Sequence, residues 1–267
     1  MRARPIAPVG IATAPALTGL WALCAWQARR ARSGPRPYSE ALPGPGLVGG
    51  ELNGQPVRVT WLGDSLAAGL GCDDIADTPA HLAARLLERP VDVAVLAVPG
   101  ARAVHVLEEQ LPLVDPRTDV VVLCVGANDV AAGTPRSQYA AQLDAVLAHL
   151  APTPVILLSL PDMAMPDRIA EPLRTVAGAW ARWFEAARAR VAARHGHVVS
   201  VDIASRPPGL SRRSGRRMLC SDRFHPGPEG YRVWAERISS ACHRVLESAP
   251  LAVLAQERGL GSVSEPG

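Results

Sequence analysis

Five runs of apolar residues recur through the middle of the chain, and longer amphipathic stretches separate them. The runs cover residues 57–62, 91–98, 119–125, 154–160 and 197–201. They are nearly continuous in Val, Leu and Ile and do not alternate with polar residues, which is typical of strands buried on both faces. The pattern therefore predicts five parallel strands inside a folded domain.

The stretches between these runs carry the signals of helices. Thr78 and Pro79 suit the N-cap and the first turn of a helix that ends at about Arg89. Residues 137–150 place their larger apolar side chains on one face, as an amphipathic helix does. Helical patterns also cover residues 173–195 and 230–246. Alternating strands and helices predict an α/β fold, a three-layer α/β/α sandwich with a five-stranded parallel sheet.

The composition divides the chain into four segments. Residues 1–34 form an N-terminal hydrophobic segment, and residues 35–56 are rich in Pro and Gly and predict a linker. Residues 57–247 contain all the strands and long helices described above and are expected to form one domain. Residues 248–267 predict a flexible tail.

The N-terminal segment has the length of a membrane span. Residues 5–27 carry no charge, and Arg29, Arg30 and Arg32 follow directly. We expect a signal anchor that associates the protein with a membrane, although a cleaved signal peptide of a secreted protein and a disordered leader stay open. More arginines follow the span than precede it, which by the positive-inside rule predicts a cytoplasmic main domain.

Charge and cysteine content narrow the function classes. The net charge is +3, every one of the 28 basic residues is arginine, and no aromatic residues are interleaved with the arginine clusters. This pattern argues against a nucleic-acid partner. The five cysteines match no metal-binding spacing; Cys72 and Cys220 could pair, but free thiols are the simpler interpretation.

Candidate chemistry follows the predicted strands. In a parallel sheet, ligands bind beyond the carboxyl ends of the strands. Ser65 comes after the first apolar run, Gly100 after the second and Asn128 after the third. We expect these three residues to lie on one rim of the sheet, with Asp222 and His225 reaching it from a C-terminal loop.

These residue types together predict acyl transfer. A serine hydroxyl becomes a nucleophile when a neighbouring base, here His225, takes its proton. Asp222 lies three residues before His225 and can hold the imidazole in the correct tautomer. The backbone amides of Ser65 and Gly100 and the side-chain amide of Asn128 could stabilise an oxyanion. The set needs neither a metal nor an organic cofactor.

Four blocks of this sequence, taken together, resemble the GDSL or SGNH hydrolase family. They are residues 63–66, Gly100, residues 126–129 and residues 222–226. The resemblance implies a flavodoxin-like sheet, no required metal, and an esterase, lipase, thioesterase or carbohydrate deacetylase activity. It also implies a nucleophilic Ser65, with the base, acid and oxyanion donors assigned above. The predicted function is a metal-independent esterase or lipase that cleaves a small-molecule or lipid ester through an acyl-Ser65 intermediate.

Other functions use the same sequence features. An acyltransferase or a thioesterase would use the same residues, and a non-catalytic, membrane-tethered binding module would keep only the fold. A metallophosphatase would need Asp-Xaa-His and Gly-His-Xaa-His motifs, and the sequence contains neither. The sequence contains no signal for the oligomeric state.

Three neighbouring features have structural interpretations. Asp64 is expected to stabilise the turn before Ser65, and Asp129 is expected to be structural. Residues 160–166, with two methionines, could line an apolar acyl slot or could pack in the core. Both interpretations of that loop stay open.

Overall fold

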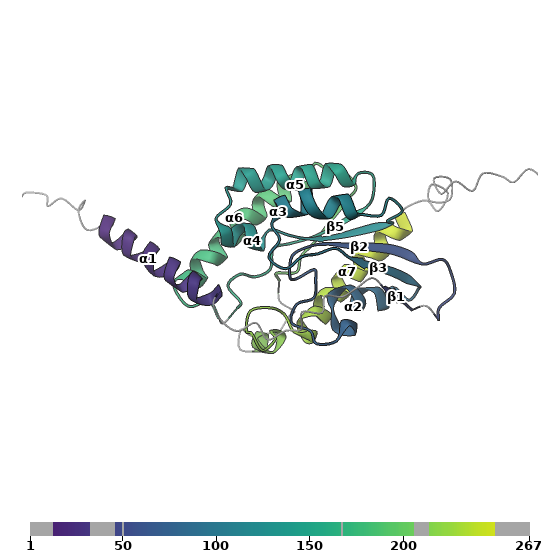
Figure 1. The fold of residues 1–267 in the computed structure, drawn as a ribbon, viewed down its shortest axis with the longest axis horizontal. Coiled ribbons are helices and arrows are strands. Elements are labelled where there is room, and N and C mark those ends of the chain that lie inside the picture. The colour runs from purple at the N-terminus through teal and green to yellow at the C-terminus, as the bar shows by residue number, and fades with distance from the viewer. Residues whose placement is uncertain (1–12, 33–45, 50, 167, 206–213, 249–267) are drawn as a thin grey trace, which may run out of the picture.

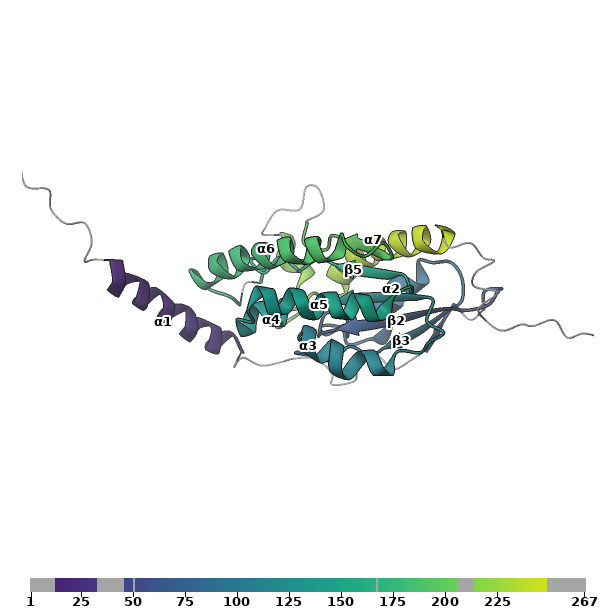
Figure 2. The ribbon, with the colours of Figure 1, turned by 90° about the horizontal axis from the view of Figure 1, so that it is seen from above.

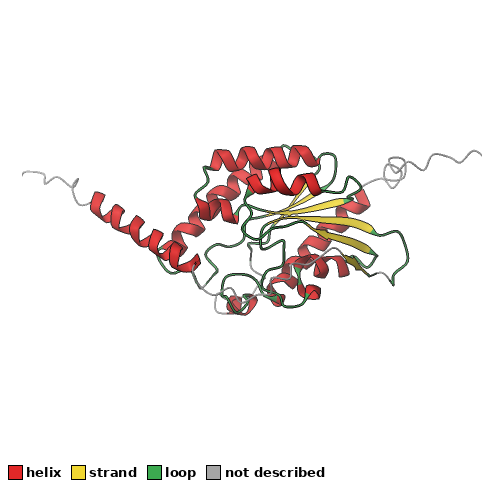
Figure 3. Cartoon of the chain, in the orientation of Figure 1, coloured by secondary structure: helices red, strands yellow, loops and turns green. Residues whose placement is uncertain are grey.

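The structure is a computed structural model that describes residues 13–32, 46–49, 51–166, 168–205 and 214–248. A twisted sheet lies at the centre, and helices cover both of its faces (Figures 1 and 3). The predicted α/β/α sandwich is therefore confirmed.

The sheet has six strands in the order β1-β3-β2-β4-β5-β6. Their bounds are β1 Gly46–Val48, β2 Val57–Gly63, β3 Val91–Val95, β4 Val120–Cys124, β5 Val155–Leu158 and β6 Val198–Val201. All neighbouring pairs from β3 to β6 are parallel, as predicted. The expected number of five is wrong by one, because β1 adds an antiparallel strand beside β3. This strand lies inside the predicted linker, and its three residues are too short to form a recognisable apolar run.

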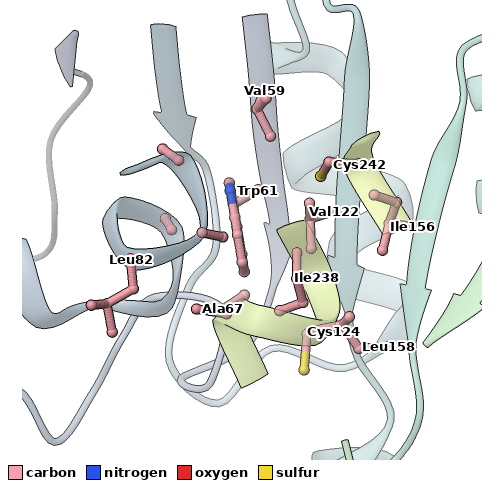
Figure 4. Close-up of a cluster of buried hydrophobic side chains, with 14 of the residues drawn as sticks. Val59, Trp61, Ala67, Leu82, Val122, Cys124, Ile156, Leu158, Ile238 and Cys242 are labelled. Carbon is pink, nitrogen blue, oxygen red and sulfur yellow. The ribbon is translucent and has the colours of Figure 1, made fainter. Parts of the chain in front are cut away.

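Helices α2 and α7 cover one face of the sheet. They span Pro79–Arg85 and Pro228–Ser248. Trp61 of β2, Val122 of β4 and Ile238 of α7 belong to the buried cluster on this side (Figure 4). Trp61 is 1% exposed, so burial of its ring contributes directly to the stability of the layer that carries the site.

Helices α3, α5 and α6 cover the opposite face (Figure 2). Their bounds are α3 Ala103–His105, α5 Arg136–Leu150 and α6 Leu173–Ala192. Leu62 of β2 and Leu123 of β4 point into this second core, one position along from the residues of the first. Burial on alternate faces explains why the strands are apolar without alternation.

Several short helical elements were not predicted. α3 continues into a π-helical segment, Val106–Gln110, and then into a 3₁₀ turn, Leu111–Leu113. The others are α4 Ala127–Ala132 and 3₁₀ turns at Ile75–Asp77 and Ser214–Met218. Each is too short to show a helical repeat of apolar residues.

The N-terminal helix α1, Thr13–Arg32, projects from one end of the domain (Figure 2). Gln27 joins it to the start of α6: its Nε2 donates to the Glu171 carbonyl at 2.6 Å, and its Oε1 accepts from the Leu173 amide at 3.1 Å. Within the described residues, no helix has both the length and the apolarity to cross a bilayer, so the expected spanning segment is not found there. α1 includes the arginines that follow the uncharged stretch, and this shortens its apolar part.

Parts of all four predicted segments lie outside the described residues. These are residues 1–12 and 33–34 of the hydrophobic segment, residues 35–45 and 50 of the linker, residues 167 and 206–213 of the domain, and residues 249–267 of the tail.

Candidate active site

The turn after β2 carries Ser65, and the neighbouring strand fixes where this turn begins. Gly63 has a φ of +133°, and a Cβ at this position would lie 1.9 Å from the carbonyl oxygen of Cys124 on β4. Only glycine fits such a close approach of two backbones. The next amide, that of Asp64, donates to the same carbonyl at 3.1 Å. The chain therefore leaves the sheet at a fixed point directly before Ser65.

Gln110 holds this turn from the opposite side. Its Oε1 accepts from the Gly63 amide at 2.8 Å, and its Nε2 donates to the Gly63 carbonyl at 2.9 Å. The side chain is 1% exposed, and it gives the buried amide of Gly63 its acceptor. The Gly63 carbonyl also accepts from the Val98 amide at 3.0 Å, so Gln110 is its second donor. The sequence did not reveal this role, because its only signal is one amide side chain in a stretch without a clear repeat.

Residues 220–225, which we call the acid–base loop, form a compact turn around Asp222. The Oδ1 atom of Asp222 accepts from the amides of Phe224 at 2.7 Å and His225 at 2.9 Å. Arg223 adopts a left-handed φ of +57°, which curls the chain so that His225 returns toward the carboxylate. This curl explains how a spacing of three residues brings the two side chains together.

The structure brings Ser65, His225 and Asp222 into one hydrogen-bonded chain. The Nε2 atom of His225 lies 3.0 Å from Ser65 Oγ, and its Nδ1 lies 2.6 Å from Asp222 Oδ2. α7 also contacts the loop after the serine, since the Tyr231 hydroxyl donates to the Leu70 carbonyl at 2.7 Å. The three side chains that the sequence suggests as nucleophile, base and acid therefore lie within hydrogen-bond distance of one another.

Two buried carboxylates of the site differ in their ionisation. Burial raises the pKa of Asp64 to about 7, and the hydrogen bond from the Leu66 amide offsets only part of that effect. Burial also acts to raise the pKa of Asp222, but hydrogen bonds from His225 and Cys220 outweigh it and hold the pKa well below its usual range. Asp222 is therefore a stable anion beside the imidazole at neutral pH.

Two backbone amides suit the oxyanion role. Neither the Ser65 nor the Gly100 amide has a hydrogen-bond acceptor among the described residues. A Cβ at Gly100 would meet no atom of the protein within 4 Å. Glycine suits this position because its φ of +85° is one that a residue with a side chain rarely adopts.

Asn128, in the first turn of α4, lies between the loops that follow β2 and β3. Its Nδ2 donates to Asp64 Oδ2 at 3.2 Å and to the Ala101 carbonyl at 3.1 Å. Both N–H groups of the amide are thus engaged, and one of them must be shared or released before it can donate to an oxyanion. Asp129 connects α4 to the start of α3, since its Oδ2 accepts from the Ala103 amide at 3.0 Å.

A mostly apolar pocket of about 110 Å³ opens beside Ser65. Its wall includes the loop after β5, the start of α7 and the acid–base loop. Apolar side chains that line it are Leu66, Met163, Met165, Ile203, Met218, Leu219, Phe224, Val233 and Trp234. Both methionines of residues 160–166 face this pocket, which favours the acyl-slot interpretation of that loop over pure core packing. Across the described part of the chain, no group of three or more His, Cys, Asp or Glu side chains could hold a metal ion.

More than half of the sequence matches a known family. The profile of the GDSL-like Lipase/Acylhydrolase family covers residues 61–233. The chain therefore belongs to this family, and the resemblance drawn from the four sequence blocks is confirmed.

The chain is similar to individual members as well. It is 27% identical over 199 residues to the GDSL-like esterase Rv1075c of Mycobacterium tuberculosis. The aligned region covers 71% of this chain and 63% of that protein. The chain thus spans less than two thirds of the length of this curated relative.

Solved structures share the fold. The psychrotrophic esterase EstA of a Pseudoalteromonas species superposes with a TM-score of 0.54 at 16% identity, covering 72% of this chain and 99% of that one. The salicylyl-acyltransferase SsfX3 of a tetracycline biosynthetic pathway superposes with a TM-score of 0.53 at 19% identity, covering 74% of this chain and 56% of that one. At these identities the likeness establishes the architecture alone.

Proposed function

We propose that the protein is a serine esterase that cleaves carboxylic esters through an acyl-Ser65 intermediate. The observation that carries this proposal is the chain from Ser65 Oγ through His225 to Asp222, with contacts of 3.0 and 2.6 Å, at the edge of an apolar pocket. Membership of a lipase and acylhydrolase family supports the same reaction.

In the first half-reaction, Ser65 Oγ attacks the ester carbonyl carbon. Its proton passes to Nε2 of His225, and Asp222 stabilises the resulting imidazolium through the short contact to Nδ1. The carbonyl oxygen becomes an oxyanion that can accept from the amides of Ser65 and Gly100 and from Asn128. Collapse breaks the bond to the alkoxy oxygen, which takes the proton from the imidazolium and leaves as the alcohol.

In the second half-reaction, water attacks the acyl-Ser65 ester. His225 takes a proton from this water, and the same donors hold the second oxyanion. When the intermediate collapses, Ser65 recovers its proton from the imidazolium and the carboxylic acid is released. Each atom in this cycle comes from ester, water or the three side chains, so the reaction requires no metal.

The pocket supports an ester with an apolar acyl chain. The acyl group takes part in the transition states of both half-reactions, whereas the alcohol leaves after the first, so contacts with the acyl group can stabilise both. Met163 and Met165 from the loop after β5 and Trp234 from α7 offer apolar surface in the pocket that Ser65 also lines. Unbranched methionine side chains adapt to chains of different shape.

An acyltransferase would share the first half-reaction and differ only in the acceptor. The name of one structural neighbour, a salicylyl-acyltransferase, illustrates that this architecture occurs in such an enzyme. Hydrolysis is the simpler proposal, because it requires only water as acceptor. Addition of an alcohol during the assay distinguishes the two, since a transferase forms a new ester in preference to the free acid.

Replacing Ser65 by alanine tests the proposal. We expect the full chain to hydrolyse p-nitrophenyl esters, with kcat/KM rising from acetate to longer acyl chains as the pocket fills. Ser65→Ala should lower kcat at least about 10⁴-fold, and a fluorophosphonate should label the wild type alone. Ser240→Ala is the matched control, because that hydroxyl donates to the Glu236 carbonyl within α7. Activity retained in Ser65→Ala would refute the assignment of the nucleophile.

A further inference from the structure

The triad carboxylate has a donor that the catalytic cycle does not use. Cys220 Sγ lies 3.0 Å from Asp222 Oδ1 and donates its S–H to that oxygen. The same oxygen accepts from the amides of Phe224 and His225, and the opposite oxygen accepts from the imidazole. Among the described residues, Cys220 is thus the one side chain other than His225 that donates to Asp222.

The backbone of Cys220 closes the acid–base loop. Its amide donates to the His225 carbonyl at 2.9 Å, and its carbonyl accepts from the Arg223 amide at 3.0 Å. The two ends of the segment from Cys220 to His225 are therefore joined directly. A shift of Cys220 would move both the carboxylate and the imidazole relative to Ser65.

The Cys220 side chain also lies against the loop that follows the nucleophile. A Cβ built on Gly71 would lie 3.3 Å from both Cβ and Sγ of Cys220. Gly71 has a φ of +105°, so the loop passes close to the thiol without a side chain of its own. One small side chain is thereby packed between the segment that positions Ser65 and the segment that positions Asp222.

The surroundings of the thiol favour a donor over a nucleophile. Burial and the hydrogen bond to Asp222 raise the pKa of Cys220 to about 12, so the sulfur keeps its proton at neutral pH. The titratable groups that interact with it are Asp222 of its own loop, Cys72 of the loop after Ser65 and Tyr231 of α7. Both cysteines are free thiols.

We propose that Cys220 is a positioning residue of the active site, which holds Asp222 in the orientation that receives the imidazole of His225. The hydrogen-bonded chain then has four members, from Ser65 through His225 and Asp222 to the thiol. The expected change in kcat rests on the proposed esterase function, whereas the expected orientation of Asp222 does not.

A matched control is available at the neighbouring cysteine. Cys72 is half-buried, and burial together with the nearby Asp77 raises its pKa to about 12 as well. Its thiol, however, donates to the Asp77 backbone carbonyl at 3.2 Å and not to a member of the triad. Substitution of Cys72 therefore reproduces the loss of a buried thiol without the loss of a donor to Asp222.

The experiment compares Cys220→Ala, Cys220→Ser and Cys72→Ala in the full chain. Cys220→Ala should lower kcat roughly 3- to 10-fold with KM unchanged, because a hydrogen bond to a charged group is lost away from the substrate. Cys220→Ser retains an O–H donor and should stay within about 2-fold of the wild type. Cys72→Ala should behave as the wild type.

Proton NMR of the free protein gives a second measurement that needs no substrate. The downfield resonance of the proton between His225 and Asp222 should move in both Cys220 variants, because the carboxylate loses or exchanges a donor, and should stay in place in Cys72→Ala. If Cys220→Ala fails to fold, the resonance of Cys220→Ser still decides. An unmoved resonance in the Cys220 variants, or an unchanged kcat in a folded Cys220→Ala, would overturn the proposal. Wild-type inactivity on esters with a moved resonance would instead count against the proposed function alone.

Discussion

Two buried aspartates, Asp64 on the nucleophile turn and Asp222 on the acid–base loop, belong to one site but hold their protons very differently. Both side chains are almost fully excluded from solvent. Asp64 accepts one backbone amide and one N–H of Asn128, and burial raises its pKa to about 7. Asp222 accepts from the thiol, two backbone amides and the imidazole, and its pKa is lowered.

The difference shows that burial alone does not decide the charge of a carboxylate. Desolvation acts on both, and the number and strength of the donors determine the net direction. Asp222, with four donors, stays ionised and can stabilise an imidazolium. Asp64, with two donors, has comparable populations of its protonated and ionised forms at neutral pH. It joins the serine turn to Asn128. The two regions should therefore respond to substitution in opposite ways.

The largest effect is expected for Asp222→Asn. The variant can still accept the amides of Phe224 and His225, but it removes the charge and the tautomer control at Nδ1. We expect kcat to fall about 10³- to 10⁴-fold, as for loss of the acid in a comparable triad. Steady-state kinetics on a p-nitrophenyl ester measure this. A loss of less than tenfold would show that His225 does not depend on this carboxylate.

The pH dependence of stability checks the same substitution from another side. Because folding lowers the pKa of Asp222, its anion stabilises the folded state above the unfolded pKa of about 3.9. This contribution is lost as the pH falls below that value. The advantage of the wild type over Asp222→Asn in free energy of unfolding should therefore shrink on acidification.

The same two regions show what sequence patterns can and cannot predict. Continuous apolar runs identified the five parallel strands, and their order along the chain placed Ser65, Gly100 and Asn128 at one rim. The role of Gln110 was not predicted, because it depends on a π-helical segment that no apolar repeat reveals. The hydrogen bonds from Asn128 to Asp64 and from Cys220 to Asp222 were not predicted either. Such partners depend on the conformation of loops, which residue spacing does not determine.

Gln110→Ala is expected to cost stability more than chemistry. It leaves the buried amide of Gly63 without its acceptor, removes one of the two donors to the Gly63 carbonyl and opens a small cavity, which together cost about 2 to 4 kcal/mol. Urea unfolding monitored by circular dichroism measures the change. Gln142→Ala is the control: its Oε1 has no hydrogen-bond partner within the described chain, so its loss should cost under about 0.5 kcal/mol. Equal destabilisation by both substitutions would refute the role of Gln110 in holding the turn at Gly63.

Asp64→Asn should give the smallest effect and the opposite dependence on pH from Asp222→Asn. Folding raises the pKa of Asp64, so above the unfolded value the unfolded state holds fewer protons and stability declines as the pH approaches 7. An uncharged amide does not suffer this decline. The free energy of unfolding of Asp64→Asn should therefore improve relative to the wild type by roughly 1 to 2 kcal/mol between pH 5 and pH 8.

Urea unfolding at both pH values provides the measurement for Asp64→Asn. A difference between variant and wild type that does not change with pH would mean that Asp64 is ionised throughout. The Asn128 amide would then donate to a carboxylate that stays charged. Releasing the amide from this charged acceptor toward an oxyanion would cost more free energy than releasing it from a neutral carboxyl group. The outcome thus decides whether the nucleophile turn holds Asn128 through a neutral or a charged hydrogen bond.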